Sequence, residues 1–190
     1  TDKKSTNFVD DGFGGKNSVI IVDNKFDKVV LNTDDPNLES AVTKFDIDFY
    51  LREPRLASSE ATSEMVVLDF FKKYKCNRVF WLNTVSPLQT IEDIKNFFNK
   101  TIDDDVQSSV AVSKHQVHVT FKGQPINFDW AQNFAKTQDM TPVLSFNYSM
   151  MSWHKDEMEM LEGGQLFNDS TMMIESSIWS SILLKSKEDF

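Results

Sequence analysis

The fold is decided by residues 77–98, "NRVFWLNTVSPLQTIEDIKNFF". The apolar run from Val79 to Leu82 is too short for a helix and too continuous for a strand with one solvated face. It therefore predicts a central strand that is covered on both faces of a sheet. Small and polar residues and a turn at Ser86 follow, and Thr90 then caps an amphipathic helix. A ligand site is expected at the polar end of this strand.

Strands and helices alternate around this stretch. Residues 18–22, "SVIIV", and 28–32, "KVVLN", are short β-branched runs that predict buried strands. Asp35 is placed as an N-cap before Pro36, which predicts a helix after the second run. A further strand is predicted over residues 45–53, and the core faces of the two later helices are expected to carry Val66, Val67, Phe70, Phe71 and Tyr74, and then Ile91, Ile94, Phe97 and Phe98.

The second half of the chain has a different pattern. Residues 108–123 alternate apolar and polar side chains, which predicts two antiparallel strands around a turn near Lys114 and His115. Residues 145–153, "SFNYSMMSW", predict one further strand. Strands alternating with helices, followed by strand pairs, predict an α/β layered fold with a mainly parallel sheet and an antiparallel addition. Ligands of such sheets bind at the carboxyl ends of the strands.

The composition of the chain disfavours several classes of partner and site. The 190 residues are 40% hydrophobic and carry a formal net charge of −9, which disfavours nucleic acid and anionic membranes as partners. No apolar run reaches the length of a spanning helix, and no secretory leader is recognisable at the start. The single cysteine, Cys76, excludes an intramolecular disulfide framework, so we expect a cytoplasmic protein. His115 and His118 fall on opposite faces of a strand, so no zinc site is expected.

Three segments carry a family likeness: "VVLNTDD" at residues 29–35, "LREPRLASSEATSEMVV" at 51–67 and "VFWLNTVSPLQTIEDI" at 79–94. In order and spacing they resemble successive blocks of the acylneuraminate cytidylyltransferases, the family that makes CMP-sialic acid. The likeness is weaker at "KTQDMTP", residues 136–142, and at "SILLKSKEDF", residues 181–190. The resemblance implies a single domain over residues 1–190 with a three-layer, Rossmann-like nucleotidyltransferase fold.

The resemblance also implies a reaction and a site. In this family a sugar hydroxyl attacks the α-phosphate of CTP and pyrophosphate leaves, so the expected partners are CTP, a sialic-acid-like nonulosonic acid and Mg²⁺. By position in the family blocks, the nucleotide is expected to contact Gly15, Lys16, Asn17, Asp34, Arg52 and Ser63. By the same reasoning the sugar is expected to contact Asn83, Ser86 and Gln138. The catalytic residues stay unassigned.

The chain departs from the family pattern where the chemistry lies. Leu183 and Lys185 occupy the positions of the two magnesium-binding aspartates, and neither side chain donates a lone pair to a cation at neutral pH. Asn83 replaces a sugar-contacting Gln, and Gln89 replaces an Arg. These changes leave two hypotheses: an active CMP-sugar synthetase, or a catalytically inactive relative that serves as a nucleotide- or sugar-binding or assembly module.

Several residues have a second interpretation that the sequence leaves open. Arg52 contacts the cytidine of CTP or pairs at the surface with Glu53 or Glu60. Ser63 contacts the nucleotide or only caps a helix. The glycine-rich residues 12–17 form a phosphate loop or an ordinary turn, and residues 1–17 are expected to be flexible. The methionine-rich residues within about 140–170, Met150, Met151, Met158 and Met160 with Trp153, form core or a homodimer contact.

Overall fold

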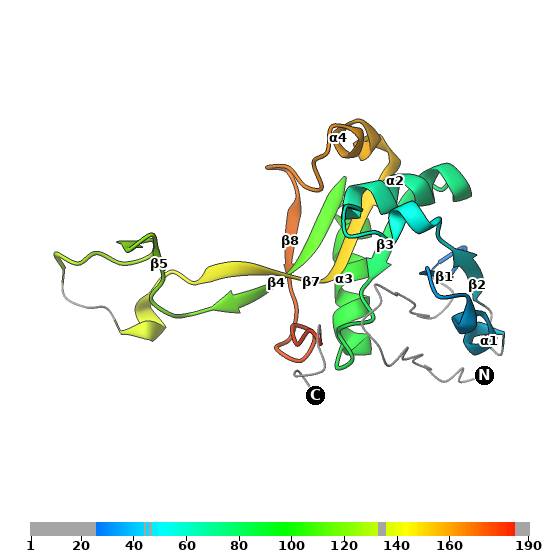
Figure 1. Cartoon of the computed structure of the whole chain (residues 1–190). Helices are drawn as coiled ribbons and strands as arrows, with labels where there is room; N and C mark the ends of the chain where they lie inside the picture. The colour runs from blue at the N-terminus through cyan, green and yellow to red at the C-terminus, as the bar shows by residue number, and fades with distance from the viewer. Residues whose placement is uncertain (1–25, 44, 46, 133–135, 185–190) are drawn as a thin grey trace.

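The computed structural model describes residues 26–43, 45, 47–132 and 136–184, and its elements are drawn in Figure 1. The strands are β1 (Val30–Thr33), β2 (Asp48–Leu51), β3 (Arg78–Leu82), β4 (Ser108–His115), β5 (Thr120–Phe121), β6 (Gln124–Pro125), β7 (Val143–His154) and β8 (Met172–Glu175). The helices are α1 (Glu39–Val42), α2 (Ser63–Tyr74), α3 (Ile91–Asp103) and α4 (Met158–Glu162), with 3₁₀ turns at Pro36–Leu38, Pro54–Leu56, Thr137–Asp139 and Lys155–Glu157. No helix of the described ranges is long and apolar enough to cross a bilayer.

The main sheet is mixed but mostly unidirectional. Within the described residues its order is β3-β7-β4-β8. β7 runs antiparallel to β3 and β4, whereas β8 runs parallel to β4. Three of these strands therefore point the same way and β7 is the antiparallel addition. A separate parallel pair, β1 and β2, lies on the β3 side of this sheet in Figure 1.

Helices cover both faces of the main sheet. On one face α3 contributes Ile94 and Phe97 to a core that includes Leu82 and Met150. On the other face α2 and α4 pack against a second core centred on Trp153. Because successive side chains of a strand point to opposite faces, β3, β4 and β7 each contribute side chains to both cores. The predicted three-layer α/β fold is confirmed.

The predicted caps at Thr90 and Asp35 are confirmed, as is most of the predicted core face of α3. Thr90 caps α3, its Oγ1 accepting a hydrogen bond from the Asp93 amide at 3.1 Å. Asp35 caps the turn that begins at Pro36, accepting from the Asn37 amide at 2.9 Å. Ile91, the first residue of α3, is the exception because it is 36% exposed.

Residues 108–123 do not form a local hairpin, so this prediction was wrong. β4 continues straight through Lys114 to His115 and pairs there with Val143 and Leu144 of β7. The two strands leave the body together as an arm that also carries β5 and β6 (Figure 1). Alternation shows that a strand has a partner but does not show which segment is the partner, and here it lies about thirty residues away along the chain.

The methionine-rich segment is core. Met150, Met151 and Trp153 are 1%, 3% and 0% exposed, and they lie in the central part of β7. Met158 and Met160 are partly buried against the core that contains Met151 and Trp153. Met150, Met151 and Trp153 are therefore core residues, and a homodimer contact within about residues 140–170 stays a prediction.

Candidate functional site

Asp34 and Arg52 meet where two neighbouring strands end. Asp34 follows β1 and Arg52 follows β2, and the parallel register places Thr33 opposite Leu51, so the next residues emerge side by side. The Arg52 amide donates to the Thr33 carbonyl at 2.7 Å, and Arg52 Nη2 donates to Asp34 Oδ1 at 2.9 Å. The Arg52 side chain is only 2% exposed, whereas that of Asp34 is 43% exposed. The alternative of a surface arginine paired with Glu53 or Glu60 is wrong; the exposed Arg55 pairs with Glu53 instead.

Two hollows adjoin this pair. A cavity of about 540 Å³ lies between β1 and β3, and Arg52 is part of its lining. A smaller hollow of about 310 Å³ is lined by Asp34, Leu51, Arg52, Pro54, Ala57 and Ser58. Both volumes are in the range of small-molecule sites. Arg52 therefore lines both spaces, and Asp34 lines the smaller one.

Asn83 and Ser86 share one turn at the carboxyl end of β3. The Asn83 amide donates to the Ser149 carbonyl at 2.9 Å, and the Ser86 amide donates to the Asn83 carbonyl at 3.1 Å. Gln89 is 4% exposed, and its Nε2 donates to the same Ser149 carbonyl at 3.1 Å. The residue that replaces the family's arginine thus supports the turn from inside. The Ser86 hydroxyl is buried and has no hydrogen-bond partner among the described residues.

The remaining predicted residues are spread over other elements. Ser63 is the first residue of α2, while Thr62 occupies its N-cap position without a side-chain hydrogen bond. Gln138 lies on the arm, where its carbonyl accepts from Gln116 at 2.9 Å. Gly15, Lys16 and Asn17 lie outside the described residues. Of the described part of the chain, neither hollow is lined by Ser63, Asn83 or Gln138. That all of these residues share one cleft stays a prediction.

Asp93 organises a cluster that the sequence did not reveal. Its carboxylate accepts hydrogen bonds from Thr90 Oγ1 at 2.9 Å, Ser180 Oγ at 2.6 Å and the Ser177 amide at 3.0 Å, and also from the Ser177 hydroxyl. Burial alone would raise the pKa of this carboxyl, but the donors from Ser177, Ser180 and Thr90 outweigh burial and hold the pKa below its usual value. The cluster ties the start of α3 to residues 177–180. No local pattern links residues more than eighty positions apart.

Leu183 lies beside the β3 turn through the same C-terminal segment. The Leu184 amide donates to the Val85 carbonyl at 2.8 Å, which brings the segment to the turn that holds Asn83 and Ser86. A Leu side chain offers no oxygen to a cation, and the described residues contain no group of three or more His, Cys, Asp or Glu side chains that could hold a metal. Lys185 lies outside the described residues. The described residues thus do not fit the magnesium site of the family.

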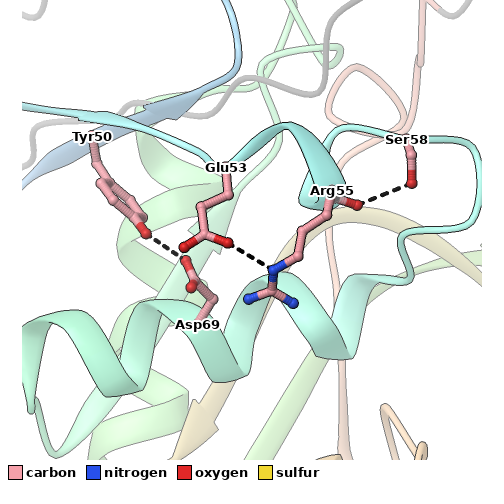
Figure 2. Close-up of polar contacts among 5 residues, drawn as sticks. All are labelled: Tyr50, Glu53, Arg55, Ser58 and Asp69. Carbon is pink, nitrogen blue, oxygen red and sulfur yellow. Dashed lines mark hydrogen bonds and ion pairs between the residues drawn. The ribbon is translucent and has the colours of Figure 1, made fainter.

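A second polar cluster joins β2 to α2 (Figure 2). Tyr50 Oη donates to Asp69 Oδ2 at 2.6 Å, and Arg55 Nε donates to Glu53 Oε2 at 2.7 Å. Burial, together with the hydrogen bond to Asp69 and its charge, raises the pKa of Tyr50 to about 12. This contact fixes the strand that ends at Leu51 against the helix that begins at Ser63.

At high pH the free energy of unfolding of Tyr50→Phe is expected to fall less steeply than that of the unmodified protein. The raised pKa means that the folded protein holds this phenolic proton more tightly than the unfolded chain, whose tyrosine pKa is about 10. The contribution of Tyr50 is therefore complete below about pH 10 and is lost as pH rises toward 12. Urea unfolding of both proteins between pH 9 and 11.5 measures the difference, and the exposed Tyr148→Phe is the control. Parallel pH profiles for Tyr50→Phe and the unmodified protein would contradict the assignment.

The comparisons with known proteins identify the family to which this three-layer α/β chain belongs. The cytidylyltransferase family matches residues 19–179, so the chain belongs to that family. It is 25% identical over 174 residues to N-acylneuraminate cytidylyltransferases of two Streptococcus agalactiae strains, serotype III (NEM316) and serotype Ia (A909), covering 87% of this chain and 42% of each relative. The chain therefore spans less than half the length of these curated relatives.

Solved structures show the same fold. The bifunctional IspDF of Campylobacter jejuni superposes with a TM-score of 0.55 at 12% identity, over 86% of this chain and 41% of that one. A CMP:2-keto-3-deoxy-manno-octonic acid synthetase complexed with CTP superposes with a TM-score of 0.52 at 12% identity, over 80% of this chain and 74% of that one. At such identities the likeness concerns the fold alone.

Proposed function

We propose that the protein is a CMP-sugar synthetase that transfers CMP from CTP to a sialic-acid-like nonulosonic acid. Family membership and the N-acylneuraminate cytidylyltransferase relatives support this activity. The observation that carries the proposal is the Asp34–Arg52 pair at the carboxyl ends of β1 and β2. This is the edge at which α/β sheets bind their ligands. The cytoplasmic location predicted from the single cysteine belongs to the same proposal.

The reaction assigns a role to each group at that edge. A hydroxyl of the sugar acid attacks the α-phosphorus of CTP, an oxygen–phosphorus bond to pyrophosphate breaks, and the hydroxyl proton passes to solvent or a base. Arg52, held in place by Asp34, presents its guanidinium to the cytidine half of CTP, together with Ser63. Asn83 and Ser86 contact the sugar from the β3 turn. No step is assigned to a metal, because Leu183 supplies no ligand.

Arg52→Gln is expected to weaken CTP binding by about 10- to 100-fold, the usual cost of losing hydrogen bonds from a charged group. Isothermal titration calorimetry with CTP measures the effect, and Arg55→Gln is the matched control because Arg55 is exposed and pairs only locally in Figure 2. Thermal unfolding of both variants checks that the fold is intact. Equal CTP affinity for Arg52→Gln and Arg55→Gln would contradict the role of Arg52.

The second candidate is a catalytically inactive relative that binds a nucleotide or sugar, and Leu183 favours it. A pyrophosphate-release assay with CTP, Mg²⁺ and a panel of nonulosonic acids separates the two functions. Turnover rules out the inactive module, whereas CTP binding without turnover supports it. Restoring both carboxylates with Leu183→Asp and Lys185→Asp is expected to give magnesium-dependent turnover if metal loss alone abolishes activity.

We also propose that the protein forms a homodimer through the arm. The large apolar side chains exposed there are Val117, Phe121, Ile126, Trp130 and Leu144, between 43% and 64% exposed. A protruding element with this many exposed apolar groups is typical of a protein–protein contact. We place the proposed contact on residues 117–144 because these apolar side chains are exposed, and a contact within about residues 140–170 stays a prediction. Sedimentation of the protein and of Trp130→Asp tests the contact.

A further inference from the structure

β7 contains an irregular stretch, residues 147–149, beside the end of β3. The stretch directly precedes Met150, which pairs with Leu82, the last residue of β3. The register between β4 and β7 shifts there, so that β7 holds more residues than β4 between two successive pairs. Tyr148 in this stretch has a φ of 55°, in the left-handed region that a bulky side chain rarely adopts. Such backbone strain persists only where surrounding contacts hold it, and it is common at functional sites.

Buried side-chain amides bind both backbone polar groups of Ser149, the last residue of the irregular stretch. The Ser149 amide donates to Asn147 Oδ1 at 3.0 Å, and the Ser149 hydroxyl donates to the same oxygen at 2.8 Å. The Ser149 carbonyl accepts from Gln89 Nε2 at 3.1 Å and from the Asn83 amide at 2.9 Å. Asn147, Ser149 and Gln89 are 6%, 0% and 4% exposed. Loss of either side-chain amide therefore leaves a buried polar group unsatisfied.

Asn147 also binds residues of two further strands. Its Nδ2 donates to Ser113 Oγ at 3.1 Å and to Ser176 Oγ at 2.9 Å. Ser113 lies in β4, and Ser176 directly follows β8. Two donated and two accepted hydrogen bonds use the full capacity of an asparagine amide, so they fix its orientation. Through Asn147, the position of Ser149 is therefore set by the main sheet.

We propose that Gln89 and Asn147 are positioning residues for the sugar half of the candidate site. Both act through Ser149, whose carbonyl holds the Asn83 amide. The Ser86 amide donates to the Asn83 carbonyl and the Gln89 amide donates to the Ser86 carbonyl, each at 3.1 Å, so the turn is fixed once Ser149 is fixed. The inference rests on the proposed function, in which Asn83 and Ser86 contact the sugar.

Gln89→Met removes the side-chain amide but keeps the length of the side chain. The KM for the nonulosonic acid that turns over fastest is expected to rise about tenfold, the usual effect of losing one buried hydrogen bond. The KM for CTP is expected to stay within about twofold, because Asp34 and Arg52 are held by β1 and β2 instead. Gln165→Met is the control, since Gln165 is exposed. Equal KM values for the sugar in the two variants overturn the proposal.

Hydrogen exchange distinguishes failure of this inference from failure of the proposed function, because it needs no substrate. In Gln89→Met and in Asn147→Ala, the amides of residues 83–89 are expected to exchange about tenfold faster, whereas those of α2 keep their rates. Unchanged exchange of residues 83–89, or equal acceleration in α2, overturns the inference even in an active enzyme. Faster exchange of residues 83–89 alone, in a protein without turnover, supports the positioning role and contradicts the proposed activity. Should Asn147→Ala fail to fold, Gln89→Met decides.

Discussion

Trp153→Ala is expected to lower the free energy of unfolding by about 4 kcal/mol, the largest effect of any single substitution considered for this chain. Trp153 is fully buried in β7, and its ring stacks on Phe167 at a centroid distance of 5.6 Å. Its Nε1 donates to the Leu166 carbonyl at 2.7 Å. Alanine removes the ring, leaves a cavity between the sheet and α4, and leaves that carbonyl without its donor. Urea unfolding followed by circular dichroism measures the loss.

Trp179→Ala is the matched control because Trp179 is 57% exposed. Its free energy of unfolding is expected to change by less than about 0.5 kcal/mol, the usual range for surface substitutions. Trp153→Phe should fall between the two, since it keeps most of the volume but loses the hydrogen bond. A loss below about 1 kcal/mol for Trp153→Ala would show that the core on this face of the sheet is misplaced.

Asp93→Asn is expected to lower the free energy of unfolding by about 2–3 kcal/mol at pH 7, because the cluster loses its charged acceptor. The depressed pKa of Asp93 sets the pH dependence. The contribution is present above the unfolded pKa of about 3.9 and is lost as pH falls through the folded pKa. The difference in stability between Asp93→Asn and the unmodified protein should therefore shrink as the pH falls below about 4.

Glu92→Gln supplies the control for this experiment, because Glu92 is exposed in the same first turn of α3. Its unfolding free energy should stay close to that of the unmodified protein at all pH values. Hydrogen exchange adds a local readout: the amides of residues 177–184 should exchange faster in Asp93→Asn, because the carboxylate anchors that segment. An unchanged exchange rate there would mean that Asp93 does not hold the C-terminal segment beside the β3 turn.

The elements that depend on near neighbours in the sequence could be predicted. β3, α3 and the caps at Asp35 and Thr90 follow from apolar spacing and from side chains that bond within three residues. The family likeness placed Asp34 and Arg52 in one nucleotide site but did not predict the ion pair between them. That pair has a simple cause in the parallel register of β1 and β2.

Features that depend on distant partners could not be predicted. The pairing of β4 with β7 brings Lys114 to Leu144, and alternation carries no information about such partners. Asp93 contacts Ser177 and Ser180 only in the folded chain, because these serines are more than eighty positions away in the sequence. Burial of Gln89 likewise depends on the Ser149 carbonyl, which the sequence places far away. In each case the contact depends on a partner whose position only the assembled fold determines.

The irregularity in β7 couples chain length to the orientation of the arm. Val110 pairs with Met151 and Val112 with Phe146, so two steps along β4 match five along β7, and Tyr148 within the extra residues has a φ of 55°. β7 therefore has three extra residues in this stretch. Because three is an odd number, Met151 and Phe146 lie on the same face of the sheet although they are five positions apart. Deletion of one residue there would move each β7 side chain of the arm to the opposite face of the strand, whereas deletion of two residues would keep each side chain on its present face. Natural length variation in this segment should accordingly occur in even steps.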